Sequence, residues 1–142
     1  MAAPAFDEIV ENFELFDDWE DRYRYVIDLG KDMEPLSEDE RVPAYKVDGC
    51  ASQVWLVPDV EDGPGAPRLT FRGDSDAMIV RGLIALLVAR YSGRPLEEIR
   101  DSDAQAEFAR LGLTEALSSQ RSNGLRAMVA RLQDLAAHGT PA

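Results

Sequence analysis

The chain has 142 residues, of which 45% are hydrophobic and 30% are charged, and its formal net charge is −12. This length and composition are typical of one globular domain with its own hydrophobic core, so we expect residues 1–142 to form a single domain. A strongly acidic surface repels phosphate backbones and anionic lipids, which argues against nucleic acid and membranes as partners.

The compartment is predicted from what the sequence lacks. The first eight residues contain no basic n-region and no apolar h-region, so we expect no signal peptide. The most apolar stretch, residues 78–89, contains Arg81 and is shorter than the roughly 20 residues that a membrane span needs. A single cysteine cannot form an internal disulfide. We therefore expect a cytoplasmic protein.

Metal chemistry and cysteine-hydrolase chemistry are disfavoured by the residue counts. A structural zinc or iron–sulfur site normally needs about four nitrogen or sulfur ligands. The chain offers one cysteine, Cys50, and one histidine, His138, which lies close to the C-terminus. We interpret His138 as a surface residue, because chain ends are usually mobile, and we expect no metal site.

Two amphipathic helices are predicted at the N-terminal end. Apolar residues recur at helical spacing over residues 6–16 and again over residues 19–27, and Gly30 can end the second helix as a C-cap. We interpret the aromatic residues among them as core and not as a ligand pocket. Residues 32–44 contain two prolines and an acidic run, which indicates an irregular connection. Arg41 within it is interpreted as a solvated charge, with a contact to a protein partner as the alternative.

Short runs of β-branched, aromatic and alternating residues predict three strands, at residues 45–47, 52–57 and 68–72. Pro58 and Gly73 are expected to end the second and third strands. Turns between the strands make a small antiparallel sheet, and Cys50 falls on the connection between the first two strands. Gly49 beside it permits backbone angles that other residues resist, which suits an exposed tip.

The remaining chain predicts helices. Asp74, Ser75 and Asp76 can cap a helix over residues 77–89, which is apolar almost all round and should lie across one face of the sheet. Pro95 suits the first position of a short helix, and a second short helix follows near residues 108–111. Ser118 or Ser119 can cap the last helix. Helices that flank a block of strands define the α+β class.

Cys50 is the candidate functional residue. A free cysteine is often a small buried hydrophobe. Here the cysteine lies on a predicted turn and is followed by Ala51 and Ser52 instead of bulky apolar residues. Because a thiol on a turn is exposed to oxidants, we interpret Cys50 as a reactive thiol.

Four blocks of sequence carry a family resemblance: WEDRYRYVIDLGK at residues 19–31, VDGCASQVWL at 47–56, GDSDAMIVRGL at 73–83 and LSSQRSNGLRAMV at 117–129. In this order they resemble the SufE family of sulfur-acceptor proteins, which work with cysteine desulfurases in iron–sulfur cluster assembly. The resemblance implies an α+β fold, a small three-stranded antiparallel sheet packed by several helices, similar to the IscU-like cluster scaffolds. With one cysteine, the chain resembles the carrier and not the scaffold.

The resemblance implies that Cys50 is the catalytic, sulfur-accepting residue. A SufS-like desulfurase that uses pyridoxal phosphate would leave a sulfane sulfur on its own cysteine, and Cys50 would take it as a persulfide and pass it to a SufBCD-like complex. The chain itself would need no cofactor. The alternatives are an adaptor that modulates the desulfurase without carrying sulfur, a carrier to another sulfur-using pathway, and a redox sensor, which would lack a resolving cysteine. Whether such an accessory protein counts as an enzyme, and whether it forms a homodimer, stay open.

Further residues in these blocks are expected to shape the cysteine loop or to face the partner: Gly49, Ser52, Gln53, Trp55, Asp74, Asp76, Arg121 and Asn123. Trp55 is expected to pack beneath the loop. For the two aspartates helix capping is favoured over contact with the loop, and for Arg121 a structural ion pair is an equal alternative. We expect Cys50 to be partly sheltered, with Ala51 and Val54 closing over it until a partner swings the loop outward.

Overall fold

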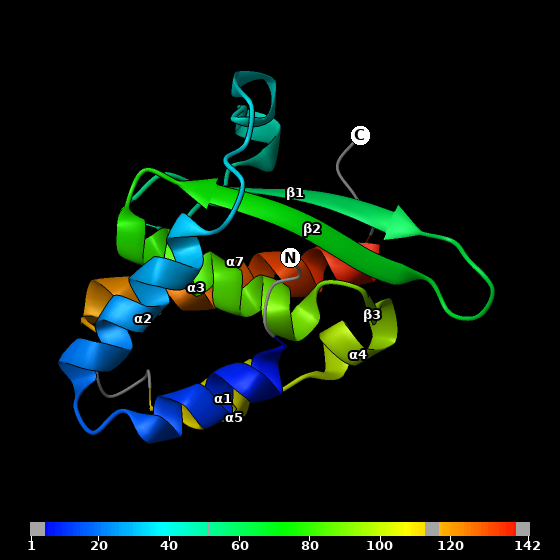
Figure 1. Cartoon of the computed structure of the whole chain (residues 1–142). Helices are drawn as coiled ribbons and strands as arrows, with labels where there is room; N and C mark the ends of the chain where they lie inside the picture. Colours follow the sequence, from blue (N-terminus) through cyan, green and yellow to red (C-terminus); the bar gives the residue numbers. More distant parts are fainter. Residues whose placement is uncertain (1–4, 51, 113–116, 139–142) are drawn as a thin grey trace.

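The computed structural model describes residues 5–50, 52–112 and 117–138. Its elements in chain order are α1 (Phe6–Leu15), α2 (Trp19–Lys31), η1 (Glu38–Glu40), η2 (Pro43–Tyr45), β1 (Val54–Glu61), β2 (Arg68–Ser75), α3 (Met78–Tyr91), β3 (Arg94–Pro95), α4 (Leu96–Asp101), α5 (Ala104–Ala109) and α7 (Ser119–His138). The helices lie on one side of the sheet, and the short 3-10 turns η1 and η2 stand on the other side (Figure 1). The predicted α+β class is confirmed.

Helix α3 lies at the centre of the molecule. Its apolar residues are spread around the whole helix, and eight of its residues are buried: Ile79, Val80, Gly82, Leu83, Ile84, Leu86, Leu87 and Tyr91. It packs against α1, α2, α7 and strand β2. A helix can be apolar all round only where other elements cover every face, so this sequence pattern predicted the central element correctly.

Helices α2 and α3 cross at two glycines. A Cβ atom added at Gly30 would lie 2.5 Å from the backbone nitrogen of Gly82, and one added at Gly82 would collide with the carbonyl of Val26. The absence of side chains lets the two backbones approach closely. The prediction that Gly30 ends α2 as a C-cap is therefore wrong: the helix continues to Lys31, and Gly30 is buried against α3.

Strands β1 and β2 pair antiparallel from Val54 opposite Ser75 to Glu61 opposite Arg68. The prediction that Pro58 ends the first of them is wrong. β1 is an edge strand, where the missing N–H of proline is tolerated, so the strand continues to Glu61. β2 likewise continues past Gly73, which lies against Ile84 of α3.

The sheet has three strands, as predicted, but one of them differs from the prediction. Residues 45–47 form no strand; Pro43 begins the 3-10 turn η2, and only Lys46 bridges to Trp55. The third strand is β3, which pairs with β2 just before α4 begins at Leu96. Two residues of strand give no periodic signal, because alternation needs at least about four residues to be visible.

The last helix agrees with the prediction, whereas the two short helices differ from it in part. Pro95 is the N-cap of α4 and not its first residue, and α5 ends at Ala109, before Leu111. The Ser118 hydroxyl accepts a hydrogen bond from the Arg121 backbone N–H at 3.2 Å, so this serine caps α7. The apolar stripe of α7 packs into the core through Leu125, Met128, Leu132 and Leu135. Within the described residues, no helix combines the length and apolar character needed to cross a membrane.

Candidate functional site

The cysteine lies on a closed loop that leads into β1. The Val47 backbone N–H donates to the Val54 carbonyl at 2.9 Å, which joins the two ends of the loop. Gly49 has a φ of 92°, in the left-handed region that favours glycine, and it immediately precedes Cys50. The predicted glycine turn is therefore present, although a hydrogen bond and a single bridge close it in place of a first strand.

The Cys50 side chain points inward against α7. It is half-buried, and its Sγ lies 3.6 Å from the Gly124 carbonyl oxygen, to which the thiol donates. It borders a cavity of about 110 Å³. The other residues that line this cavity are Ser52, Val80, Leu83, Gln120, Arg121, Gly124, Leu125 and Met128. The thiol thus faces a small space with apolar walls from α3 and α7 and a polar rim from the start of α7.

The environment keeps the Cys50 thiol protonated. Burial is the main cause that raises its pKa above the ordinary value, because it disfavours the charged thiolate, and the negative charge of Asp48 raises the pKa further. The hydrogen bond to the Gly124 carbonyl also requires the proton. A thiolate is the nucleophile and the metal ligand, so the site as it stands is in a resting state.

Two of the other predicted residues, Ser52 and Arg121, line the Cys50 cavity. Arg121 is exposed and forms no salt bridge within the described part of the chain. Asn123 lies further along α7, where it accepts a hydrogen bond from Arg126 at 3.1 Å, and it does not line the cavity. Ala51, expected to cover the thiol, lies outside the described residues.

The exit of the cysteine loop is fastened to the end of β2. The backbone N–H of Gln53 donates to the Asp76 carboxylate at 3.0 Å, and the Gln53 carbonyl accepts from the Ser75 hydroxyl at 2.7 Å. The preference for helix capping at Asp76 is wrong, because α3 begins after Ala77 and has no capping side chain. Asp76 instead contacts the cysteine loop, the alternative interpretation.

Asp74 is the buried charge of this region. It is 1% exposed and binds the Leu36 backbone N–H at 3.0 Å, Arg41 at 2.7 Å and Arg81 at 3.3 Å. Burial opposes ionisation of this carboxyl, but the hydrogen bonds from Arg41, Leu36 and Ser75 and the charge of Arg81 outweigh it and lower its pKa.

Three predictions about this cluster need correction. Asp74 neither caps α3 nor touches the loop, because its carboxylate lies on the face of β2 where the 33–41 segment crosses. Trp55 does not pack beneath the loop: its neighbours Val54 and Leu56 are fully buried, and Trp55 faces the other side of β1, with its ring centroid 6.0 Å from the Arg41 guanidinium. Arg41 is thus a structural ion-pair partner and not a free surface charge.

Several residues that shape the cavity were missed by sequence reasoning. The Gly124 carbonyl accepts the hydrogen bond from the thiol, and Val80, Leu83, Leu125 and Met128 supply the apolar walls. A glycine inside the first turns of a helix, where alanine would be favoured, was the one available signal. The apolar residues gave no signal, because they belong to helical stripes that predict core in any helix.

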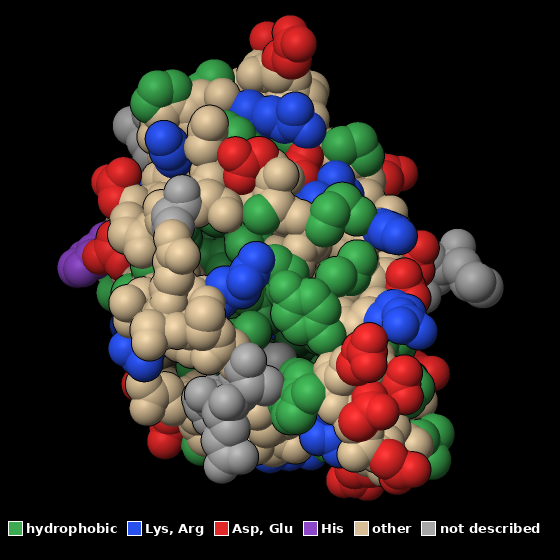
Figure 2. Space-filling view, turned by 90° about the vertical axis from the view of Figure 1, so that its left-hand side faces the viewer, with side chains coloured by type: hydrophobic (Ala, Val, Ile, Leu, Met, Phe, Trp, Pro, Cys, Tyr) green, Lys and Arg blue, Asp and Glu red, His purple; other side chains and the backbone are tan. Residues whose placement is uncertain are grey.

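The end of the molecule where α2 and α7 begin is shown in Figure 2. Apolar side chains gather in the middle of this face, basic side chains lie among them, and acidic side chains gather towards its rim. Met78, the first residue of α3, is 48% exposed. No group of three or more histidine, cysteine, aspartate or glutamate side chains that could hold a metal ion occurs among residues 5–50, 52–112 and 117–138.

Comparison with known proteins identifies the family. The model of the SufE family, described as an Fe-S metabolism associated domain, matches residues 7–136. The chain belongs to the SufE family. A SufE-like protein of Rhizobium etli is 55% identical over 130 residues, which cover 92% of this chain and 88% of the relative. Another from Rhizobium meliloti is 49% identical over 138 residues, 97% of this chain and 99% of the relative.

The fold of this SufE-family chain is also found in a solved structure. The solution structure of a hypothetical protein from Thermus thermophilus matches with a TM-score of 0.71, covers 98% of each chain and is 24% identical. This likeness concerns the fold. Membership of the SufE family associates the chain with iron–sulfur metabolism.

Proposed function

We propose that this protein accepts sulfur from a cysteine desulfurase onto Cys50 and delivers it to the assembly of iron–sulfur clusters. The observation that carries the proposal is the position of the only cysteine, half-buried beside a cavity of about 110 Å³ on a glycine turn. A water-sized group needs roughly 10–15 Å³. The cavity therefore has room for a second sulfur atom on Cys50, away from small thiols that would reduce it.

The transfer follows the chemistry of thiol–disulfide exchange. The Cys50 thiolate attacks the terminal sulfur of a persulfide on the desulfurase. A new S–S bond forms at Cys50, the S–S bond on the desulfurase breaks, and the desulfurase cysteine leaves as a thiolate. The proton lost by Cys50 balances the one that this thiolate takes up. One cysteine suffices on the acceptor, and a second one nearby would attack the persulfide and release sulfide.

The resting state requires help from the partner. Because burial and Asp48 raise the thiol pKa, Cys50 becomes a nucleophile at neutral pH only when its surroundings change. Partner binding that moves the loop outward removes the hydrogen bond to Gly124 and exposes the sulfur to water or to a base of the partner. Transfer is then confined to the complex.

The partner surface is proposed at the end of the molecule shown in Figure 2, where apolar and basic side chains lie together within an acidic rim. Arg121, exposed and on the edge of the Cys50 cavity, would contact the desulfurase there. The pyridoxal phosphate belongs to the desulfurase. A cytoplasmic complex of the SufBCD type is the proposed acceptor downstream.

Intact-mass measurement tests the proposal. After incubation with a desulfurase and L-cysteine, the wild-type protein is expected to gain one sulfur atom, and the Cys50→Ser variant is expected to gain none. The same two proteins are compared for stimulation of alanine release. If Cys50→Ser stimulates the desulfurase fully while the wild type never gains sulfur, the protein is an adaptor and not a carrier.

A further inference from the structure

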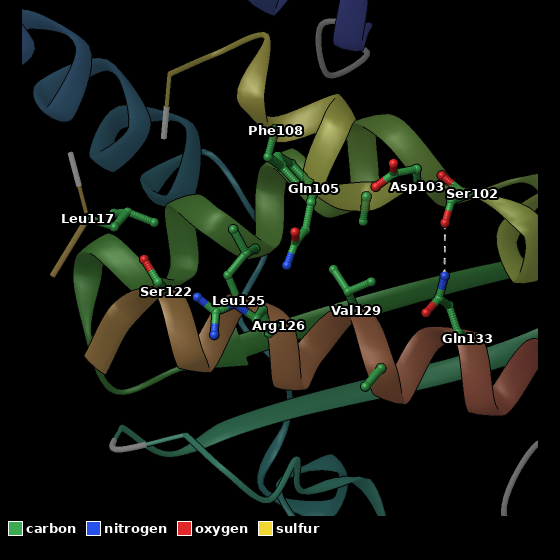
Figure 3. Close-up of a pocket in the computed structure, with 12 residues that line it drawn as sticks. Ser102, Asp103, Gln105, Phe108, Leu117, Ser122, Leu125, Arg126, Val129 and Gln133 are labelled. Atoms are coloured by element: carbon green, nitrogen blue, oxygen red, sulfur yellow. Dashed lines mark hydrogen bonds between the residues drawn. The ribbon is translucent and has the colours of Figure 1, made fainter. Parts of the chain in front are cut away.

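A second and larger cavity lies between α5 and α7. Its volume is about 360 Å³. Phe108, Leu125 and Val129 give it apolar walls, and the Gln105 side chain points into it between Leu125 and Val129 (Figure 3). Leu125 also lines the Cys50 cavity, so this one residue of α7 borders both spaces. We call the larger cavity the α5–α7 groove.

The groove is elongated along α7. Its lining residues on this helix run from Ser122 to Gln133, a span of about 16 Å at 1.5 Å per residue. Leu117 and Ser122 lie at one end, and Ser102 and Asp103 lie at the other (Figure 3). A hydrogen bond of 3.1 Å from the Gln133 amide to the Ser102 carbonyl fixes the second end.

The two ends of the groove carry opposite charges. Arg126 lies near the Ser122 end, and Asp103 lies at the Gln133 end. One oxygen of Asp103 accepts from the Ala106 backbone N–H at 3.1 Å, and Arg126 donates to Asn123. Neither Asp103 nor Arg126 forms a salt bridge within the described segments. Both charges are thus available to an incoming molecule.

We propose that the α5–α7 groove binds an amphipathic helix of a partner protein. Helices that bind in grooves present side chains at positions i, i+3, i+4 and i+7. Positions i and i+7 lie about 10 Å apart, which equals the separation of Arg126 and Gln133 along α7. The bound helix carries an acidic residue against Arg126, a basic residue against Asp103, and two apolar residues between them that enter the groove beside Phe108 and Val129.

Charge and location favour a protein helix over a small zwitterion. The amino and carboxylate groups of a free amino acid share one carbon atom, whereas Arg126 and Gln133, which is hydrogen-bonded to Ser102 beside Asp103, lie about two helical turns apart along α7. The groove also begins close to Gly124, the residue that holds the Cys50 thiol. A protein bound in the groove would therefore contact α7 close to the part of this helix that contacts the Cys50 sulfur.

The test uses the full chain with Cys50→Ser and no desulfurase, so its result is independent of sulfur transfer. The probes are capped, alanine-based peptides of about 16 residues, long enough to be helical. They carry two leucines at i+3 and i+4 and either Glu at i with Lys at i+7 or the reverse order. Backbone amide NMR titration is expected to show that one order binds and shifts the resonances of α5 and α7 that line the groove.

Two variants test the charges without disturbing the fold. Asp103→Asn keeps the hydrogen-bond cap of α5 but removes the charge, and Arg126→Gln removes the other charge on an exposed side chain. Exchange of Lys for Gln in the peptide is expected to weaken binding up to about fivefold in the parent, the range of a surface ion pair, and to have no effect in Asp103→Asn. Exchange of Glu for Gln in the peptide is likewise expected to weaken binding to the parent protein and to have no effect on binding to Arg126→Gln.

The proposal is overturned if neither peptide binds at millimolar concentration, or if peptides with serine in place of the leucines bind as well. It is also overturned if the charge variants leave the discrimination unchanged, or if free L-alanine or L-cysteine shifts the groove resonances and displaces the peptide.

Discussion

Two ionisable groups, one on the cysteine loop and one on β2, are held in opposite ways. Cys50 keeps its proton, and its sulfur makes one hydrogen bond of 3.6 Å to a backbone carbonyl. Asp74 has lost its proton and binds two arginines and two backbone N–H groups. Burial opposes ionisation of both groups, and only Asp74 has the positive charges that outweigh it.

The difference lies in how many contacts hold each group. The Asp74 cluster ties the 33–41 segment, β2 and α3 together, and the next residues along β2 fasten the exit of the cysteine loop at Gln53. The sulfur itself makes one hydrogen bond, a weak one to the Gly124 carbonyl. We infer a fixed frame with a releasable thiol, which suits transfer to a partner.

The largest expected effect comes from breaking the fixed frame. Asp74→Ala leaves the charge of Arg81, whose side chain is only 18% exposed, without a carboxylate, although Arg81 keeps its hydrogen bonds to the carbonyls of Gly30 and Met33. Removal of one partner of a buried ion pair costs about 3–5 kcal/mol of stability. Cys50→Ser should cost about 1 kcal/mol or less, as is usual away from such features. Urea unfolding of both variants measures the difference. Equal losses in the two variants would show that the two groups are held equally firmly.

The pH dependence of Asp74 sharpens the comparison. Its pKa is lower folded than unfolded, so its contribution to stability is present above the unfolded value of about 3.9 and is lost as pH falls towards the folded value. The stability difference between the wild type and Asp74→Asn is therefore expected to shrink in urea unfolding curves below about pH 4. A difference that stays constant down to about pH 2 would contradict the assigned ionisation.

Gly124→Ala is expected to raise the stability of the protein while it lowers the reactivity of the Cys50 thiol. The added Cβ would lie 3.7 Å from the Cys50 sulfur, an ordinary van der Waals distance, and alanine inside a helix is more stable than glycine by about 0.5–1 kcal/mol. The variant should unfold at higher urea concentration, and iodoacetamide should alkylate Cys50 more slowly because the sulfur is more covered. Faster alkylation in a stabilised variant would contradict the prediction, because it would mean that the position of α7 at residue 124 does not limit access to the thiol.

The smallest effect is expected from Asp48→Asn. Its charge is the lesser of the two causes that raise the Cys50 pKa, so removal of the charge should lower that pKa while burial keeps it above the value of a free thiol. The pH profile of alkylation measures the change. A profile that coincides with that of a free thiol would show that the cysteine is not sheltered in solution. The exposed Glu34 can be changed to Gln as a matched control, since its charge is not among the causes of the shift.

Local patterns in the sequence determined the main helices and the position of the candidate site. The apolar pattern of residues 77–89 identified α3 as the central helix, the stripes of α1, α2 and α7 were visible from their spacing, and the lone cysteine beside Gly49 marked the candidate site. These features depend on residues a few positions apart, whose periodicity and turn chemistry can be read directly.

Contacts between distant segments were decided only by the tertiary structure. The acidic stretch at residues 74–76 looked like a helix cap, but Asp74 binds arginines from two other segments and Asp76 binds the cysteine loop. Gly30 looked like a helix stop and is the crossing point with α3, and the third strand is two residues long. The hydrogen-bond acceptor of the Cys50 thiol is a backbone carbonyl 74 residues away. A backbone carbonyl has the same chemistry in every residue, so the glycine could mark a close approach to α7, but the use of its carbonyl follows only from the packing of this helix.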